Sequence, residues 1–80
     1  MKSEKLTEYL IKQIARDPES VSVKAFETEE EIIIEVLVSK DDIGMIIGKS
    51  GKMIQSIRTI VSAAAYHNGE KKTKINIDSI

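Results

Sequence analysis

Two glycines with two polar residues between them, Gly48-Lys49-Ser50-Gly51, divide a long apolar part of this chain in two. Isoleucine and methionine fill most of residues 43–47, just before the glycines. Behind them, apolar residues recur at helical spacing over residues 53–64. This arrangement predicts a short helix that ends at about residue 47, a glycine loop, and a second helix over residues 52–66.

Capping and helix-breaking residues set the expected ends of the helices. Ser3 can cap a first helix, and Pro18 ends that helix near Arg16, because the residue before a proline avoids the helical region. The pair Asp41-Asp42 can supply the cap of the short helix before the loop. Asn68-Gly69 ends the long helix, since glycine readily adopts the left-handed conformation of a helix terminus.

Alternating apolar and polar residues predict three strands, at about 20–27, 31–38 and 73–80. Phe26 breaks the alternation of the first strand, so it marks either a bulge or a side chain that covers an outer face. Residues 31–38 carry apolar side chains on both faces. The chain is therefore predicted to run helix, strand, strand, short helix, loop, helix, strand.

Length and composition limit what this chain can be. Eighty residues make one domain, residues 1–80, with a small core. The absence of cysteine excludes disulfides and thiolate metal sites. The N-terminal segment is amphipathic and unlike a signal peptide, and no apolar run exceeds four residues. We therefore expect a soluble, cytoplasmic protein without a membrane span.

Charge is nearly balanced in total but unevenly distributed. The net charge is −1, from 12 Lys and Arg against 13 Asp and Glu, which argues against strong, purely electrostatic binding of nucleic acid. Glutamates gather at residues 27–31, where we expect a solvated hairpin. From Lys49 to Lys74 there are six cations and one anion, Glu70. A local basic surface can therefore coexist with an acidic total.

Three interpretations of the glycine loop need different chemistry. The residues from Gly44 to Ser50 look like a nucleotide-triphosphate loop, but that loop needs four residues between its glycines and this chain has three. A purely structural turn explains one glycine, and it explains less well two glycines with a lysine between them and Lys52 behind them. A clamp for the backbone of single-stranded nucleic acid accounts for all of these residues.

The residue types of the loop fit such a clamp. Glycines let a sugar–phosphate backbone approach closely, and the N-terminus of the following helix offers free amides and a partial positive charge. A lysine in the first helical turn opposes the helix dipole, so Lys52 suits a phosphate better than it suits helix stability. Arg58 contacts RNA or forms a salt bridge. The residues that we expect to bind RNA are Ile47, Gly48, Lys49, Ser50, Gly51, Lys52 and Arg58.

The residues around the loop resemble the signature of the KH module of RNA-binding proteins. An apolar pair, a Gly-x-x-Gly loop and an apolar residue three positions later follow one another from Ile46 to Ile54. KH modules use this loop to hold about four nucleotides. The extra helix and strand at the N-terminus are similar to the prokaryotic type II KH fold. Residues 42–44 and 57–65 resemble the small bacterial single-KH proteins of the KhpA family, and the resemblance covers essentially the whole chain.

This resemblance implies both a fold and a function. The fold is α+β, in the order α-β-β-α-α-β, with a three-stranded mixed sheet and helices packed on one face. The function is that of an RNA chaperone or post-transcriptional regulator, without catalysis, cofactor or metal. The implied partners are single-stranded RNA, a second copy of the chain, and a larger KH-containing RNA-binding protein. Met45 stands where relatives often carry a basic residue, which lowers the affinity that we expect.

No other pattern indicates chemistry, and one alternative stays open. His67 has no second histidine and no suitably spaced carboxylate, so it predicts neither a metal site nor catalysis. The aromatic residues lie outside the loop, and we therefore do not expect base stacking to carry the binding. The near-neutral charge and the apolar outer face of residues 31–38 also suit a KH-like protein-interaction adaptor with weak RNA affinity.

Overall fold

The computed structural model describes residues 1–80, and its central strand is β2 (Glu31–Val38). β2 pairs antiparallel with β1 (Ser22–Glu27) and parallel with β3 (Lys72–Ser79), which gives the order β1-β2-β3. The predicted three-stranded mixed sheet is confirmed. The strand bounds differ from the predicted ones by no more than about two residues, as is usual for element ends.

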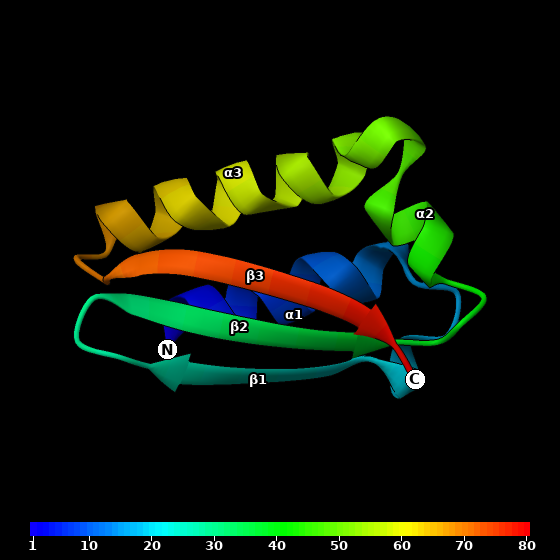
Figure 1. The fold of residues 1–80 in the computed structure, drawn as a ribbon, viewed down its shortest axis with the longest axis horizontal. Coiled ribbons are helices and arrows are strands. Elements are labelled where there is room, and N and C mark those ends of the chain that lie inside the picture. Colours follow the sequence, from blue (N-terminus) through cyan, green and yellow to red (C-terminus); the bar gives the residue numbers. More distant parts are fainter.

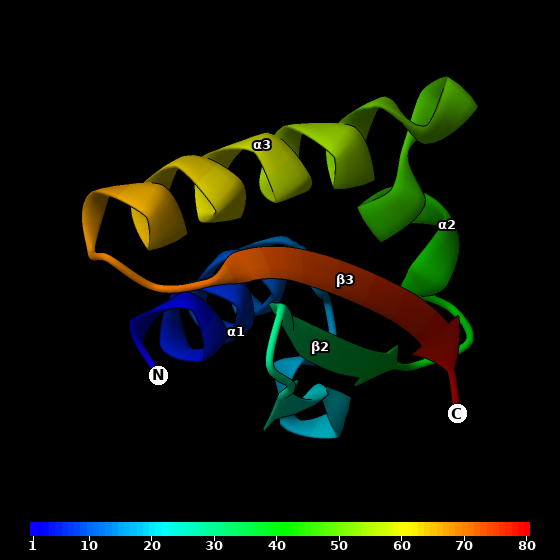
Figure 2. The same cartoon turned by 60° about the vertical axis from the view of Figure 1, so that its left-hand side comes forward.

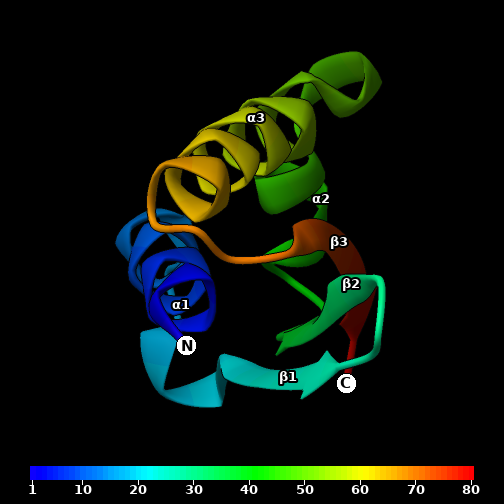
Figure 3. The same ribbon diagram turned by 90° about the vertical axis from the view of Figure 1, so that its left-hand side faces the viewer.

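Three helices accompany the sheet: α1 (Lys2–Ile14), α2 (Ile43–Ile47) and α3 (Lys52–His67). Short 3-10 turns follow α1 at Pro18–Ser20 and α2 at Lys49–Gly51. Figures 1 and 2 show α3 running above the sheet, with α2 at one end of the molecule. Viewed from the end, α1 and α3 lie on the same side of the sheet, and its other face carries no helix (Figure 3). The predicted α+β order is confirmed.

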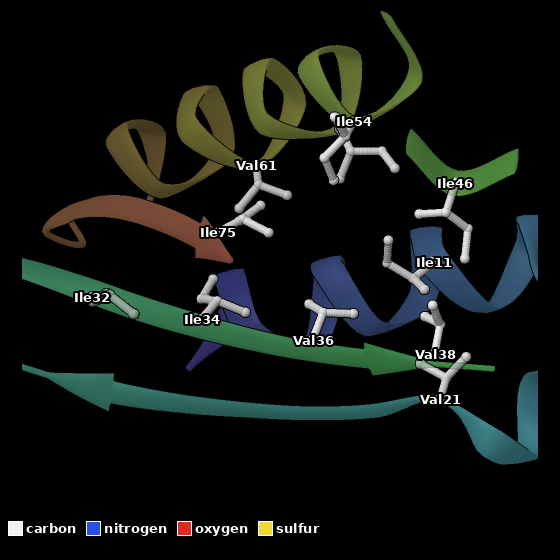
Figure 4. Packing of buried hydrophobic residues seen from close by; sticks show 11 residues of the cluster. Ile11, Val21, Ile32, Ile34, Val36, Val38, Ile46, Ile54, Val61 and Ile75 are labelled. Carbon is white, nitrogen blue, oxygen red and sulfur yellow. The ribbon is translucent and has the colours of Figure 1, made fainter. Parts of the chain in front are cut away.

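The core lies between the sheet and the helices. The even-numbered side chains of β2 are buried, because alternate residues of a strand point to the same face. Figure 4 shows side chains from α1, α2, α3 and the sheet converging on this layer. Each fully buried isoleucine or valine stabilises the fold by about 1.5–3 kcal/mol. The buried cluster comprises Ile11, Val21, Ile32, Ile34, Val36, Val38, Ile46, Ile54, Ile57, Val61 and Ile75.

Phe26 sits opposite Ile33 on the outer face of the sheet. The pairing between β1 and β2 is continuous from Ser22 to Glu27, so the bulge considered for Phe26 is wrong. Phe26 is 55% exposed, and Ile33 beneath it is half-buried. The phenylalanine therefore covers part of the outer face, and Leu37 further along the strand stays 42% exposed.

Two predicted helix caps are wrong, because long-range partners take the polar groups. Ser3 lies inside α1, and both its N–H and its Oγ donate to Oε1 of Glu70, at 3.3 and 2.6 Å. Asp42 occupies the N-cap position of α2 but makes no side-chain cap bond. Its carboxylate instead accepts N–H bonds from the residues that follow α1, Arg16 and Asp17, at 3.0 Å each. The two carboxylates therefore fasten α1 at both ends.

The other helix ends follow the prediction. α1 stops at Ile14, two residues before the expected end, and the backbone at Asp17 is non-helical ahead of Pro18 (φ −117°, ψ 74°). α3 ends in a left-handed glycine, Gly69, with φ +72°. The N–H of Glu70 donates to the carbonyl of Ala65 at 2.8 Å, which satisfies a carbonyl of the last helical turn.

The glutamate-rich turn between β1 and β2 is exposed, as predicted, and a lysine fastens it. Nζ of Lys71 lies 2.9 Å from Oε2 of Glu27 and donates to the carbonyl of Thr28 at 2.7 Å. Lys71 follows α3, so this turn and the α3–β3 connection meet at the end of the molecule opposite α2 (Figure 1). One of the six cations between Lys49 and Lys74 is therefore already paired with the acidic turn.

Candidate nucleic-acid interface

The glycine loop joins α2 to α3 at one end of the molecule, as Figure 1 shows. The N–H of Gly48 donates to the carbonyl of Gly44 at 2.9 Å and ends α2. A single tight turn follows, closed by a 3.1 Å bond from the N–H of Gly51 to the carbonyl of Gly48. α3 then starts at Lys52, as predicted. The structure therefore confirms the helix, loop and helix that the sequence indicates.

Gly48 is required by both conformation and space. Its φ is +80°, a region that L side chains rarely adopt. A Cβ at this position would lie 2.6 Å from Cβ of Met53 and 2.8 Å from the backbone nitrogen of the same residue. Both atoms belong to the first turn of α3, so neither can move without shifting the helix. Gly48 therefore lets α2 and α3 approach each other directly behind the loop.

Two more residues of the loop have left-handed backbones. Gly51 has φ +75° and open space where a Cβ would stand, so only its conformation favours glycine. Ser50 has φ 56° and is the only non-glycine residue of the chain with a positive φ. Such strained residues concentrate at functional sites, where the surrounding structure holds them in place.

The polar side chains of the predicted loop residues face solvent. Lys49, Ser50 and Lys52 are all exposed, and none makes a side-chain hydrogen bond or ion pair within the chain. Ile47 is half-buried and packs against the core, so only part of its side chain faces solvent. The loop therefore offers two lysines and a hydroxyl beside a small apolar ledge.

Arg58 lies away from the loop, on the side of α3 that faces β3. Its guanidinium donates to Oε1 of Gln55 and to the backbone carbonyl of Ile75, both at 3.1 Å. It pairs with no carboxylate, so the salt bridge considered for it is wrong. Arg58 instead joins the helix to the free edge of β3, and it remains half-buried.

A groove of about 920 Å³ runs between α3 and β3 and starts one turn beyond the loop. The groove was not predicted as part of the site. The sequence indicates it only through the helical spacing of four residues on the polar side of α3, namely Gln55, Arg58, Ser62 and Tyr66. The lining consists of Gln55, Arg58, Thr59, Ser62, Ala63 and Tyr66 from α3 and residues 73–76 from β3.

Asp42 fixes the position of α2 and hence of the loop. Its side chain is buried, and its two oxygens accept hydrogen bonds from consecutive backbone N–H groups just after the C-terminus of α1. α2 has only five residues and buries only Ile46, so it has little stability of its own. The N–H bonds from Asp17 and Arg16 hold the pKa of Asp42 below its ordinary value of 3.8. The charged carboxylate is therefore the form that the folded protein favours.

We expect the protein to lose stability in acid because of Asp42 and Glu70. The hydrogen bond from the Ser3 hydroxyl likewise lowers the pKa of Glu70 below its ordinary value of 4.5. A carboxylate with a lowered folded pKa stabilises the fold above its unfolded pKa and stops doing so as the pH falls through the folded pKa. Thermal unfolding measured from pH 7 to about pH 2.5 should show a midpoint temperature that decreases once the pH is below about 4.5.

The matched variants for that titration are Asp42→Asn and Glu70→Gln, which remove the titration and keep the shape. Each should lower the midpoint at pH 7 and flatten its fall in acid. The double variant Asp42→Asn Glu70→Gln combines both changes. If its midpoint falls as steeply in acid as that of the parent chain, these two carboxylates do not cause the acid sensitivity.

The described structure contains neither a metal-binding cluster nor a membrane-spanning helix. Nowhere do three or more His, Cys, Asp or Glu side chains gather so that they could hold a metal ion. No helix combines the length and the apolar character needed to cross a bilayer.

Solved structures share this fold. Over 99% of this chain, the structure aligns with part of Era from Aquifex aeolicus bound to GDP and aluminium fluoride, at a TM-score of 0.71 and 17% identity. Era in complex with a GTP analogue and a segment of 16S ribosomal RNA gives the same TM-score at 18% identity. This chain spans 31% and 30% of those two proteins. At such identity, the likeness shows the fold alone.

Sequence relatives identify the family. A family model described as the KH domain of KhpA and KhpB matches residues 4–77. The RNA-binding protein KhpA of Clostridium perfringens is 42% identical over 66 residues, which cover 82% of this chain and 88% of that protein. KhpA of Caldanaerobacter subterraneus is 40% identical over 70 residues, 88% of this chain and 91% of that protein. The order of elements fits the type II KH fold, and the chain belongs to the KhpA/KhpB family of KH domains.

Proposed function

We propose that this protein binds single-stranded RNA, with the Gly-x-x-Gly loop on the sugar–phosphate backbone and the bases in the groove between α3 and β3. The observation that carries the proposal is the loop itself, whose strained backbone and exposed lysines lie one helical turn before the groove begins. KH modules hold about four nucleotides with such a loop. Relatives that are 40–43% identical are named RNA-binding proteins.

Each loop residue has a distinct role in this proposal. The two glycines allow the RNA backbone to come close, and Lys49 and Lys52 pair with phosphates. The Ser50 hydroxyl donates a hydrogen bond to a phosphate oxygen. The N–H of Lys52 donates to the carbonyl of Lys49, and the other amides of the first turn of α3 have no partner within the helix, so they add a partial positive charge at the same place. Ile47 contacts the first base, and Arg58 positions the wall of the groove.

The charge distribution supports binding that is weak and short. Lysines and Arg58 line the loop and the groove, whereas the glutamates of residues 27–31 lie at the end of the molecule opposite the loop, where Lys71 pairs with Glu27. We expect two to four phosphate contacts, and hence a slope of roughly −1.5 to −3 when log K is plotted against log salt. Fluorescence anisotropy with a labelled oligoadenylate at several salt concentrations measures it. A slope near about −8 would show an extensive basic surface and contradict the proposal.

The same titration distinguishes the type of nucleic acid. A duplex RNA of the same length and label should bind more weakly than the single strand, because its bases are stacked and cannot enter the groove. Equal affinity for the two would mean that the protein recognises charge alone. That outcome would contradict the proposal that the groove binds unpaired bases.

We infer that the protein acts without catalysis, as an RNA chaperone or post-transcriptional regulator in the cytoplasm. Relatives that are 40–43% identical are named RNA-binding proteins, and the residues that we assign to the site are suited to binding. Weak contact with backbone and few bases suits a protein that acts on many RNAs. A second copy, or a larger KH-containing protein, would add a second clamp and raise the affinity through effective concentration.

The alternative is a protein-interaction adaptor with weak RNA affinity. The exposed Phe26 and Leu37 on the helix-free face of the sheet favour it, because large exposed apolar side chains often mark contact surfaces. Sedimentation with and without RNA separates the two functions. A tight dimer that shows no RNA affinity favours the adaptor, and RNA binding by the parent chain favours the clamp.

A further inference from the structure

We propose that Tyr66 stacks on an RNA base at the far end of the groove. This inference rests on the proposed RNA-binding function and adds a residue to it. Tyr66 lies in the last turn of α3, lines the groove, and is 88% exposed. Sequence analysis set the aromatic residues aside because none lies in the loop. The fold brings this ring to the same groove as Arg58, which changes that conclusion.

The distance along α3 suits a bound strand. Lys52 and Tyr66 are 14 residues apart, which corresponds to about 21 Å of helix at about 1.5 Å per residue. A KH loop holds about four nucleotides, so a strand gripped at the loop reaches the last turn of α3 with its final base. Tyr66 therefore stands where that base would otherwise be exposed to water.

Tyr66 also borders a second hollow, and both hollows contain cations. The smaller hollow, of about 230 Å³, is lined by Ser62, Tyr66, Glu70, Lys71 and Lys72, and the main groove includes Lys74. The acidic turn already holds Lys71. Lys72 and Lys74 form no ion pair, so they are available for phosphates on either side of a stacked base.

The exposure of the ring is itself informative. A tyrosine that leaves 88% of its surface in water contributes almost nothing to the core of this chain. Stacking on an aromatic ring accepts any base, because every base has a π-face. This agrees with a protein that grips backbone at one end of the groove and has limited sequence preference at the other.

Substitution of Tyr66 tests the inference. Tyr66→Ala should weaken binding of a labelled oligoadenylate by about 5- to 150-fold, because a base stacked on an aromatic ring contributes about 1–3 kcal/mol. Tyr66→Phe keeps the ring and should bind like the parent chain. The matched control is Tyr9→Ala, which removes a 60% exposed tyrosine of α1 and should leave the affinity unchanged. Loss of affinity in the phenylalanine variant would show that the hydroxyl, and not the ring, acts.

A ligand without bases separates stacking from charge. An abasic oligonucleotide of the same length should bind the parent chain and Tyr66→Ala equally. Intrinsic fluorescence gives an independent signal, because the chain has no tryptophan and two tyrosines. In Tyr9→Phe the remaining signal is that of Tyr66, and oligoadenylate should quench it while the abasic strand does not.

The outcomes for stacking and for RNA binding are distinct. If the parent chain binds oligoadenylate and Tyr66→Ala binds it equally well, the stacking inference is wrong and the loop clamp stands. If the parent chain binds neither ligand, the proposed function itself fails.

Discussion

Lys49→Asp combined with Ser50→Asp should nearly abolish RNA binding and leave the fold intact. Both side chains are exposed at the tip of the loop and contact no core residue, so stability should change little. Aspartate tolerates the left-handed backbone at residue 50 better than most residues. Two charge-assisted contacts are lost and two negative charges face the phosphates, so we expect affinity to fall on the order of a hundredfold or more. Anisotropy titration measures the loss, and circular dichroism checks the fold.

The matched control carries the same change in net charge on another surface. Lys5→Asp with Gln13→Asp places it on exposed positions of α1, and α1 does not line the groove. This control should bind RNA nearly as the parent chain does. If both double variants lose affinity equally, total charge governs binding and the loop has no special role. Unchanged affinity in the folded loop variant would be the clearest evidence against a clamp.

Gly48→Ala should destabilise the protein by about 2–5 kcal/mol. A left-handed non-glycine residue costs about 1–2 kcal/mol, and an added methyl group in packed surroundings about 1–3 kcal/mol more. The methyl group would meet the backbone of Met53, which can move only with the start of α3. For a domain of this size the loss is a large share of the total stability. Urea unfolding followed by circular dichroism measures it.

Gly51→Ala is the control within the same loop. Its φ is also positive, but open space surrounds the added methyl group. We therefore expect only the conformational part of the loss, about 1–2 kcal/mol. The difference between the two variants isolates the close approach of Gly48 to Met53. Equal losses would mean that α2 and α3 do not meet as closely in solution as they do here.

Patterns of local origin predicted most of the fold. The apolar residues at every even position of 32–38 indicated the central strand, and the apolar spacing after Lys52 indicated α3. Both signals depend on which side of one element faces the core, so a single sequence contains them. The loop was equally visible, because Gly48 and Gly51 have positive φ angles that glycine adopts without strain.

What the sequence could not show depends on residues far apart in the chain. Asp42 resembles a helix cap until the fold brings Arg16, 26 positions away, to its carboxylate. Ser3 bonds to Glu70, 67 positions away. The groove needs β3 beside α3, and a parallel register between β2 and β3 leaves no local signal. The place of Tyr66 in the wall of that groove was hidden for the same reason, because the residue is distant from the loop in the sequence.

Ser50 has a consequence for how the loop recognises its ligand. A third glycine would satisfy the left-handed backbone more easily, and it would also leave the free loop with many conformations. Serine reduces the number of conformations open to the free loop, and the neighbouring helices hold its backbone at φ 56° in the absence of a ligand. The loop is thus preorganised, and a strand that binds it loses little further entropy in ordering the protein. If the loop clamps RNA as we propose, it therefore does so without an induced fit.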